Sequence, residues 1–510
     1  MRFFEIMLVL VNIMAFCTLT VKQLHTIRWL GYAALAALLI AAMQVVVEGF
    51  RWQMVPAYAL AAIFLVIRLL GIGTGGSLHV NRVVSFLGAG SGIIAIVISI
   101  VLPAVLPVFS FPRPTGPYGI GTTTYHWVDM SRPELFTADP GDHRELMAQV
   151  WYPAKKEPSM RRAPYIQDAD VLAPAIGRLL HMPEFVFSHL KYVTTNAVAS
   201  APAADDKPDY PVLLYLTGIY GFRSANTFQI EELVSHGYIV IGLDQPGIDP
   251  MARFPDGRQI PGLSRDEIVP LNMQSVEPQP KAPTLFGQPM PEGTIPYFAQ
   301  DASFALDQLE ALNNSDPNRI LTGRLDLGHI GTFGVSMGGM DAAMASLKDS
   351  RLKACLIADV YIPAEVVAKG LKQPTMFLTR NADTMRLEHD RNGTWEEKDI
   401  TLTIDTMRKV YENLPGDGYY VQIPGIFHIS FTDVPYWSPL MPQIGWTGPI
   451  NAQRGFDIIN AYSLAFFDKE LKGQSSPLLE GPSQQYPEVD FESLKAAPAF
   501  RPVPPPSQKP

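Results

Sequence analysis

Charged side chains are scarce in this chain of 510 residues, at 17% of the sequence against about 25% in an average soluble protein. The shortage is concentrated in residues 1–110, which hold eight charged side chains and three of the 45 prolines. This front segment carries a net charge of +4, whereas the rest of the chain carries −13. We therefore expect an apolar, weakly basic front and an acidic, proline-rich globular body.

Cysteine is also nearly absent, and the two that occur, Cys17 and Cys355, cannot form a disulfide framework. Cys17 lies in an apolar run and Cys355 in an expected strand, so we expect no disulfide between them. No histidines and cysteines are spaced as metal ligands, so we expect neither a metal nor another cofactor. The acidic body has no basic stripe to neutralise phosphates, which argues against a nucleic-acid partner.

Long apolar runs dominate the front of the chain. They cover residues 6–21, 29–47, 54–70 and 83–109. Each is about long enough to cross a hydrocarbon layer of roughly 30 Å at about 1.5 Å per residue. The sequence thus predicts a multi-span anchor of about four transmembrane helices in residues 1–110, with the lipid bilayer as partner. For the first run, a cleaved signal peptide is the alternative.

The connections between these runs are short, so we expect antiparallel hairpins whose loops alternate between the two membrane faces. One set of loops contains four basic residues and the other set contains three, namely Lys22, Arg28, Arg68 and Arg82 against Arg2, Arg51 and Arg113. Basic loops tend to stay in the cytoplasm. This bias predicts that the N-terminus and the body lie on the extracytoplasmic side.

The body alternates strand-like and helix-like segments from about residue 210 onward. Nearly continuous apolar strands separated by amphipathic helices indicate a mostly parallel sheet covered on both faces. We expect this α/β domain to span residues 111–472, with an antiparallel start at 120–153. Residues 248–298 lack periodicity and are interpreted as a lid. Residues 473–510 are expected to form a proline-rich tail without chemistry.

A nucleophile motif follows one of the expected strands. The sequence Gly334-Val335-Ser336-Met337-Gly338 has the form Gly-x-Ser-x-Gly and precedes a helix-like segment. A sharp turn between a strand and a helix exposes the serine hydroxyl, and the two glycines are needed where the backbones crowd. The context predicts that Ser336 is a catalytic nucleophile, against the alternative of an ordinary turn.

A serine nucleophile needs a base, and an acid to orient that base. Only His389 and His428 follow Ser336 in the sequence. His428 comes just after the last expected strand, whereas His389 lies in a charged run typical of a solvated loop, so His428 is the predicted base. Asp359 and Asp383 each follow a strand beyond Ser336, and position alone leaves both open as the acid.

The tetrahedral intermediate requires hydrogen-bond donors for its oxyanion. The backbone N–H of Met337, directly after the nucleophile, is one expected donor. The loop after the strand at 210–216 should supply the other, through the N–H of Ile219. Gly218 would let the backbone approach there, and an ordinary glycine turn is the alternative.

Several stretches together resemble the platelet-activating factor acetylhydrolase family, the plasma and intracellular type-II branch of the α/β-hydrolases. They are RPTGPYGIGT (113–122), QVWYP (149–153), YPVLLYLTGIYGFR (210–223), SHGYIV (235–240), GVSMGG (334–339), CLIADVYIP (355–363) and HISFTD (428–433). The resemblance covers roughly residues 113–470. It implies the α/β-hydrolase fold, added to the predicted bundle of membrane helices.

Residue by residue, the resemblance implies Ser336 as nucleophile, Asp359 as acid and His428 as base, with oxyanion donors at Ile219 and Met337. It favours Asp359 over Asp383 because the family places its acid on the strand directly after the helix that follows the nucleophile motif. The chain departs from the family at Thr217, where a histidine usually precedes the oxyanion glycine, and in its multi-span front.

These features predict a membrane-anchored serine esterase without a cofactor. The resemblance implies carboxylic ester substrates with short or oxidised acyl chains on phospholipids. A lipase, a polyester hydrolase or an acyltransferase would use the same residues. A non-enzymatic membrane sensor or binding protein, in which the spans do the work, is the alternative of another class.

Overall fold

The computed structural model describes residues 1–21, 23–24, 27–73, 82–156 and 160–495. Lys22 and residues 496–510 of the expected tail lie outside this part. Contacts divide the chain into two compact units. The first contains residues 1–112, 162–195 and 434–443, and the second contains the remainder.

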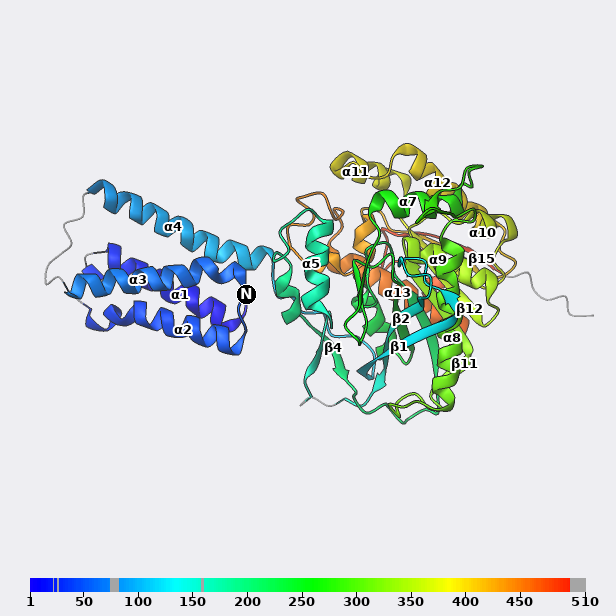
Figure 1. Cartoon of the computed structure of the whole chain (residues 1–510), viewed down its shortest axis with the longest axis horizontal. Helices are drawn as coiled ribbons and strands as arrows, with labels where there is room; N and C mark the ends of the chain where they lie inside the picture. Colours follow the sequence, from blue (N-terminus) through cyan, green and yellow to red (C-terminus); the bar gives the residue numbers. More distant parts are fainter. Residues whose placement is uncertain (22, 25–26, 74–81, 157–159, 496–510) are drawn as a thin grey trace, which may run out of the picture. The chain divides into compact units, whose positions relative to one another are not determined.

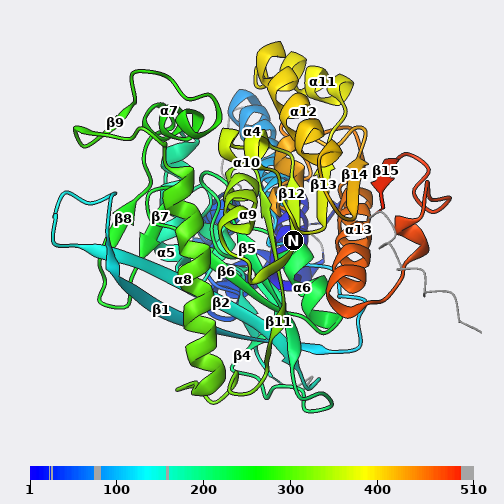
Figure 2. The same ribbon diagram turned by 90° about the vertical axis from the view of Figure 1, so that its right-hand side faces the viewer.

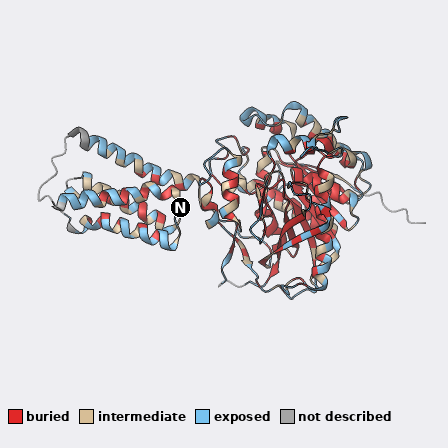
Figure 3. Cartoon of the chain, viewed as in Figure 1, coloured by how far each residue is buried: buried red, intermediate tan, exposed pale blue. Residues whose placement is uncertain are grey.

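The first unit contains four long apolar helices. They are α1 (Phe3–Thr20), α2 (Ala33–Val47), α3 (Val55–Gly73) and α4 (Arg82–Val105). The helices lie side by side (Figure 1), and they are long and apolar enough to cross a membrane, with mean hydropathy of 2.0 to 2.2. Their outer faces are exposed (Figure 3), whereas small side chains such as Ala37, Ala57 and Ala61 are buried between them. Small residues let helix backbones approach closely.

One end of this bundle contains an ion pair that the sequence pattern did not signal. Arg51 Nη1 lies 2.8 Å from Glu5 Oε1, and both side chains are fully buried. Burying one of these charges alone would be costly, so each requires the other. A guanidinium N–H of Arg51 also donates to the Leu106 carbonyl oxygen, which ties the end of α4 to the start of α3.

Residues 162–195 and 434–443 were expected in the catalytic domain but belong to the same compact unit as these helices. Trp52 Nε1 donates to the Val186 carbonyl oxygen over 3.1 Å, and its ring lies edge-on to Phe185 at 5.1 Å. The Tyr192 hydroxyl donates to the Phe50 carbonyl oxygen over 2.8 Å. The expected boundary at residue 110 therefore does not separate the compact units, because these contacts join residues more than 130 positions apart.

The second unit is built on a large sheet. Its strands lie in the order β15-β14-β13-β12-β11-β5-β6-β2-β1-β4. Their bounds are β1 (Gly119–Pro133), β2 (His143–Ala154), β4 (Thr194–Ala199), β5 (Tyr210–Leu216), β6 (Ile239–Asp244), β11 (Leu325–Val335), β12 (Leu352–Ala358), β13 (Thr375–Thr379), β14 (Gly418–Gln422) and β15 (Asp490–Leu494). The short strand β3 (Arg162–Pro164) falls within the first unit.

Within this order, the six strands β14-β13-β12-β11-β5-β6 are parallel to one another, and β1 and β2 form the expected antiparallel start. Val335 at the end of β11 lies opposite Ala358 at the end of β12. Gly334 lies opposite Leu216 at the end of β5. The residues that follow these three strands therefore meet at one edge of the sheet, where parallel α/β sheets place their sites.

Helices cover both faces of this sheet, as the alternating pattern predicts (Figure 2). The helices of the second unit are α6 (Thr227–Ser235), α7 (Arg265–Val276), α8 (Ile295–Asn314), α9 (Met337–Lys348), α10 (Ala364–Lys369), α11 (Ala382–Asn392), α12 (Glu397–Glu412) and α13 (Ala452–Lys472). Helix α5 (Ala169–Leu179) belongs to the first unit. Helices α8 and α9 bury their apolar side chains in one core with the sheet, for example Leu306, Leu309 and Met340. Helices α6 and α13 contact each other and the sheet.

Residues 248–298 are folded rather than structureless. They contain α7 and two short hairpins, β7 (Met251–Arg253) with β8 (Gln259–Pro261) and β9 (Thr284–Leu285) with β10 (Gln288–Pro289). Ile268 and Leu271 of α7 are buried in the main core. This helix was not predicted from the sequence because polar residues and Pro270 interrupt its apolar spacing.

The expected tail also contributes to the sheet. Strand β15 pairs antiparallel with β14, with Phe491 opposite Val421. The sheet thus extends past the expected boundary at residue 472. Phe491 packs on Tyr462 of α13 with ring centroids 5.8 Å apart, and this long-range contact holds a segment with no clear pattern of its own.

Candidate active site

Ser336 occupies a strained turn between β11 and α9. Its backbone has φ 58° and ψ −131°, a conformation that residues other than glycine rarely adopt and that concentrates at functional sites. A Cβ atom on Gly334 would lie 2.1 Å from the Gly338 carbonyl oxygen, and one on Gly338 would lie 2.0 Å from that of Leu216. Both flanking positions therefore require glycine. The turn leaves Ser336 partly exposed between buried neighbours.

The loop after β5 lies directly against this turn. A Cβ atom on Gly218 would lie 3.0 Å from both Ser336 Cβ and the Val335 carbonyl oxygen. The N–H groups of Ile219 and Met337 have no hydrogen-bond partner within the described part of the chain. Two unpaired backbone donors next to a serine hydroxyl have the arrangement that an oxyanion hole requires.

His428 and Asp359 form a close pair at the same edge of the sheet. His428 begins a short 3-10 helix after β14, and its Nδ1 lies 2.6 Å from Asp359 Oδ2. Asp359 directly follows β12, and the Ser336 N–H donates to the carbonyl oxygen of the residue before it, Ala358, over 2.9 Å. The imidazole is 21% exposed, whereas the carboxylate is fully buried.

The Asp359 carboxylate is held in its charged form. Burial alone would raise the pKa of Asp359, but the charge of Arg380 and the hydrogen bond from His428 together hold it well below its usual range. Oδ1 accepts hydrogen bonds from Thr379 Oγ1 and Arg380 Nε, each over 3.0 Å. Asp359 also has φ 52°, so its backbone is strained like that of Ser336.

The alternative residues from the sequence lie in other surroundings. The Asp383 side chain is 91% exposed and pairs with Arg386 at 3.2 Å. His389 is also exposed, and its Nδ1 lies 3.0 Å from the Thr394 carbonyl oxygen. Both belong to helix α11, where the sequence suggested a solvated loop. Of the two acids left open by position, the structure brings Asp359, and not Asp383, to the imidazole.

Three further residues surround the Asp359–His428 pair, and the sequence reading missed them. Arg380 is fully buried beside Asp359, and Glu388 accepts a hydrogen bond from the His428 backbone N–H over 3.0 Å. The Trp395 ring lies 4.8 Å from the His428 ring. The sequence does contain a signal for Arg380. It is a charged residue directly after an apolar strand, which places it at the edge of the sheet where the site forms.

Helix α7 contacts the turn that contains Ser336. Asn272 Nδ2 lies 3.0 Å from the sulfur of Met337, and the Thr294 hydroxyl donates to the same amide side chain. The residue after Ile219, Tyr220, donates its N–H to the Ile248 carbonyl oxygen over 2.8 Å. Its hydroxyl donates to the Leu263 carbonyl oxygen over 3.0 Å. Residues 248–298 thus lie next to both unpaired donors, the N–H groups of Ile219 and Met337.

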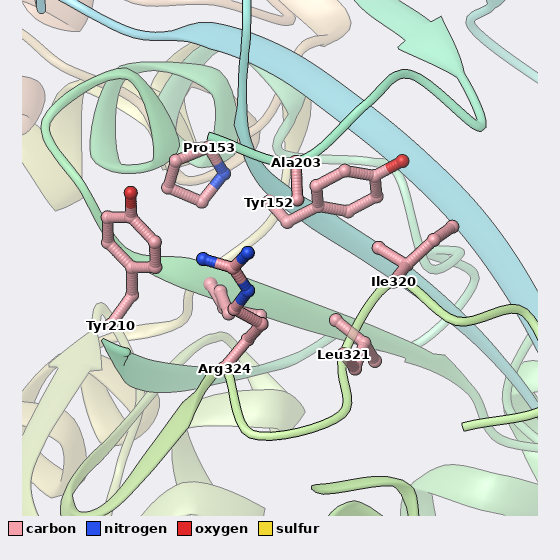
Figure 4. A pocket seen from close by; sticks show the side chains of 8 residues that line it. Tyr152, Pro153, Ala203, Tyr210, Ile320, Leu321 and Arg324 are labelled. Atoms are coloured by element: carbon pink, nitrogen blue, oxygen red, sulfur yellow. The ribbon is translucent and has the colours of Figure 1, made fainter. Parts of the chain in front are cut away.

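A separate pocket lies at the opposite edge of the sheet (Figure 4). It is lined by Tyr152, Pro153, Ala203, Tyr210, Ile239, Ile320, Leu321 and Arg324. Tyr210 begins β5 and pairs with Leu325 at the start of β11, whereas Ser336 follows the end of β11. This pocket is therefore not part of the serine site. Among the described residues, no group of three or more His, Cys, Asp or Glu side chains could hold a metal ion.

Known proteins similar to this chain are esterases. No family model matches the sequence. A probable 1-alkyl-2-acetylglycerophosphocholine esterase from Arthroderma benhamiae is 26% identical over 433 residues, which cover 79% of this chain and 98% of that protein. A platelet-activating factor acetylhydrolase from Gallus gallus is 21% identical over 390 residues, covering 71% of this chain and 84% of that protein.

A solved structure supports the same assignment. The ferulic acid esterase from Streptomyces cinnamoneus is similar with a TM-score of 0.57 and 26% identity. The match covers 76% of this chain and 99% of that one. Together with the mostly parallel sheet and its covering helices, these similarities confirm the expected fold class and reaction class. The chain is an α/β-hydrolase and a carboxylic ester hydrolase, and it is similar to platelet-activating factor acetylhydrolases.

Proposed function

We propose that this protein is a membrane-anchored serine esterase that hydrolyses short or oxidised acyl esters of phospholipids with Ser336, His428 and Asp359. The observation that carries the proposal is the strained backbone of Ser336, φ 58°, beside two unpaired backbone N–H groups. The 2.6 Å contact between His428 and Asp359 at the same sheet edge supplies the acid–base pair.

The proposed chemistry follows from these positions. His428 accepts the Ser336 hydroxyl proton as the serine oxygen attacks the ester carbonyl carbon. Asp359 accepts the hydrogen bond from Nδ1, which leaves Nε2 as the base and stabilises the imidazolium. The N–H groups of Ile219 and Met337 stabilise the oxyanion. His428 then protonates the leaving alcohol, and water, activated by the same imidazole, releases the acyl group from Ser336.

The substrate class rests on the relatives. The Arthroderma benhamiae protein is named for 1-alkyl-2-acetylglycerophosphocholine and the Gallus gallus protein for platelet-activating factor. The four apolar helices support a lipid substrate, because they would hold the enzyme at a membrane. The ferulic acid esterase shares the fold with a different named substrate, so a profile of ester hydrolysis is the discriminating measurement.

Labelling with a fluorophosphonate probe tests the nucleophile. The detergent-solubilised full chain should be labelled, and Ser336→Ala should abolish both labelling and ester hydrolysis. Ser346→Ala, on the same helix α9 but outside the site, is the matched control and should retain both. Hydrolysis that survives in Ser336→Ala would exclude the proposed mechanism. The acyl preference is measured on phosphatidylcholines with sn-2 chains from acetyl to palmitoyl, and equal rates across this series would exclude the short-chain preference.

We extend the proposal to the orientation of the chain, with the catalytic residues on the extracytoplasmic side. The bias of four basic residues against three in the connecting loops supports this side. Protease added to intact cells should cleave the catalytic unit, whereas protection until the membrane is permeabilised would reverse the orientation. Resistance of the protein to extraction by alkaline carbonate tests the membrane anchoring itself.

Residues 248–298 are proposed to form a fixed cover that limits acyl length. The contact of Asn272 with the Met337 sulfur supports this position. Because α7 belongs to the core, deleting the segment would unfold the protein, and a point substitution is the better test. Asn272→Ala should change the ratio of rates on acetyl and long-chain esters while probe labelling continues. The exposed Lys281→Ala is the control, and an unchanged ratio in Asn272→Ala would refute the cover.

A further inference from the structure

Arg380 is a buried arginine whose Nε and Nη1 both meet carboxylates, whereas its Nη2 has no hydrogen-bond partner among the described residues. It directly follows β13, and its side chain is fully inaccessible to solvent. Its Nε lies 3.0 Å from Asp359 Oδ1 and 2.9 Å from Oδ2. Its Nη1 donates to Glu388, whose side chain is 4% exposed. A buried arginine requires such charged partners.

Glu388 connects this arginine to the base. The Glu388 oxygen that accepts from Arg380, Oε2, also accepts the backbone N–H of His428 over 3.0 Å. Arg380 thus contacts the Asp359 carboxylate directly and the main chain of His428 through one carboxylate. The two ends of the Asp359–His428 hydrogen bond are held by a single guanidinium.

The Trp395 ring contacts both Arg380 and His428. The Arg380 guanidinium carbon lies 4.5 Å from the centre of the Trp395 ring, and the same ring meets His428 at a 60° angle. Trp395 has φ 61°, a strained conformation for a bulky residue. Such strain persists where the surrounding contacts impose it. An aromatic face over a guanidinium adds a further attraction that is strongest away from water.

We propose that Arg380 is a positioning residue of the esterase. It fixes Asp359 and, through Glu388, the His428 main chain in the geometry for proton transfer, and its charge offsets one of two buried carboxylates beside the imidazole. This inference rests on the proposed function, because it assigns Arg380 a role in the action of Ser336, His428 and Asp359.

The charge balance gives the inference a distinctive signature. Asp359, Glu388 and Arg380 together carry a net charge of −1 near the imidazole. The Tyr420 hydroxyl also lies near Asp359, and because burial raises the pKa of Tyr420, this hydroxyl stays neutral throughout the acid limb. Removing Arg380 leaves a net charge of −2, which favours the imidazolium over the neutral base. The acid limb of the pH–rate profile should then move upward by roughly one pH unit.

Four variants test both roles with hydrolysis of p-nitrophenyl acetate by the full chain. Arg380→Met should lower kcat by about 100-fold, as expected for a displaced catalytic pair, with KM unchanged because Arg380 is buried. Glu388→Gln should move the acid limb downward, since the net charge becomes zero. The double variant restores a net charge of −1 and should return the limb to the native pH. Arg380→Lys keeps the charge and should keep the limb while kcat falls.

The matched control is Arg386→Met on helix α11. Arg386 pairs with Glu397 at 2.7 Å, but its side chain is 50% exposed, so kcat and the pH profile should remain native. If Arg380→Met does not fold, Glu388→Gln and Arg380→Lys still give the predicted order of acid limbs. Acid limbs that do not follow the net charge, or a native kcat in Arg380→Met or Arg380→Lys, would overturn the inference. Activity that survives Ser336→Ala would instead refute the proposed function, so the two failures are distinguishable.

Discussion

Replacing Asp359 by asparagine tests which group sets the proton position on His428. Oδ1 of Asp359 accepts hydrogen bonds from Thr379 and Arg380, and Oδ2 faces His428 Nδ1 at 2.6 Å. An amide has only one oxygen. Arg380 Nε lies within reach of both positions, 3.0 Å from Oδ1 and 2.9 Å from Oδ2, so the Thr379 hydroxyl, which donates at the Oδ1 position, selects that position for the oxygen. The asparagine NH₂ group then faces Nδ1, which must become an acceptor, so the imidazole carries its proton on Nε2.

An imidazole protonated on Nε2 cannot take the proton of Ser336. The same carboxylate-to-amide change in a serine protease lowers kcat by about 10⁴-fold with the geometry intact, which corresponds to roughly 5.5 kcal/mol of transition-state stabilisation. We expect a loss of this size in Asp359→Asn, measured as kcat for a p-nitrophenyl ester and as the rate of fluorophosphonate labelling.

The control for this experiment is Asp383→Asn, the acid that position alone could not separate from Asp359. Its side chain is exposed and paired with Arg386, so its activity should be native. Thermal unfolding of each variant shows whether the fold is retained. A folded Asp359→Asn enzyme within about tenfold of native kcat, or a comparable loss in Asp383→Asn, would refute the assignment of the acid.

Two further predictions concern the stability of the site. Gly338→Ala places a Cβ atom 2.0 Å from the Leu216 carbonyl oxygen and should lower the free energy of unfolding by about 1–3 kcal/mol or more, measured by chemical denaturation. Gly416→Ala, where a Cβ atom meets nothing within 4 Å, should be neutral. The pKa of Asp359 is below its usual range in the folded state despite its burial, because of Arg380 and His428. Its contribution to stability is therefore fully present above about pH 4 and is lost as the pH falls toward the folded-state pKa. Between pH 5 and 3 the native protein should lose more stability than Asp359→Asn, and parallel losses would contradict this.

Local patterns in the sequence predicted much of the fold. The apolar runs in residues 1–110 correspond to α1 through α4, because length and hydropathy are properties of a continuous segment. The alternation of apolar strands and amphipathic helices predicted the parallel sheet, since burial on both faces requires it. Helix α7 and strand β15 were not predicted, because the contacts that stabilise them come from distant residues.

The candidate site divides in the same way. The sequence by itself determined that Ser336 follows a strand and precedes a helix between two glycines, and that His428 comes after the last parallel strand. Both conclusions depend on order along the chain. The residues alone left Asp359 and Asp383 open, and they gave no role to Glu388 or Trp395.

The tertiary structure decided which side chains meet. Parallel pairing of β11 with β12 places Asp359 next to Ser336, whereas Asp383 lies on an exposed helix face. Arg380 is fully buried and Glu388 almost fully buried, although Glu388 lies in a charged run that suggests a solvated surface. Burial and charge pairing depend on residues from separate strands and helices coming together, and no local pattern encodes that convergence.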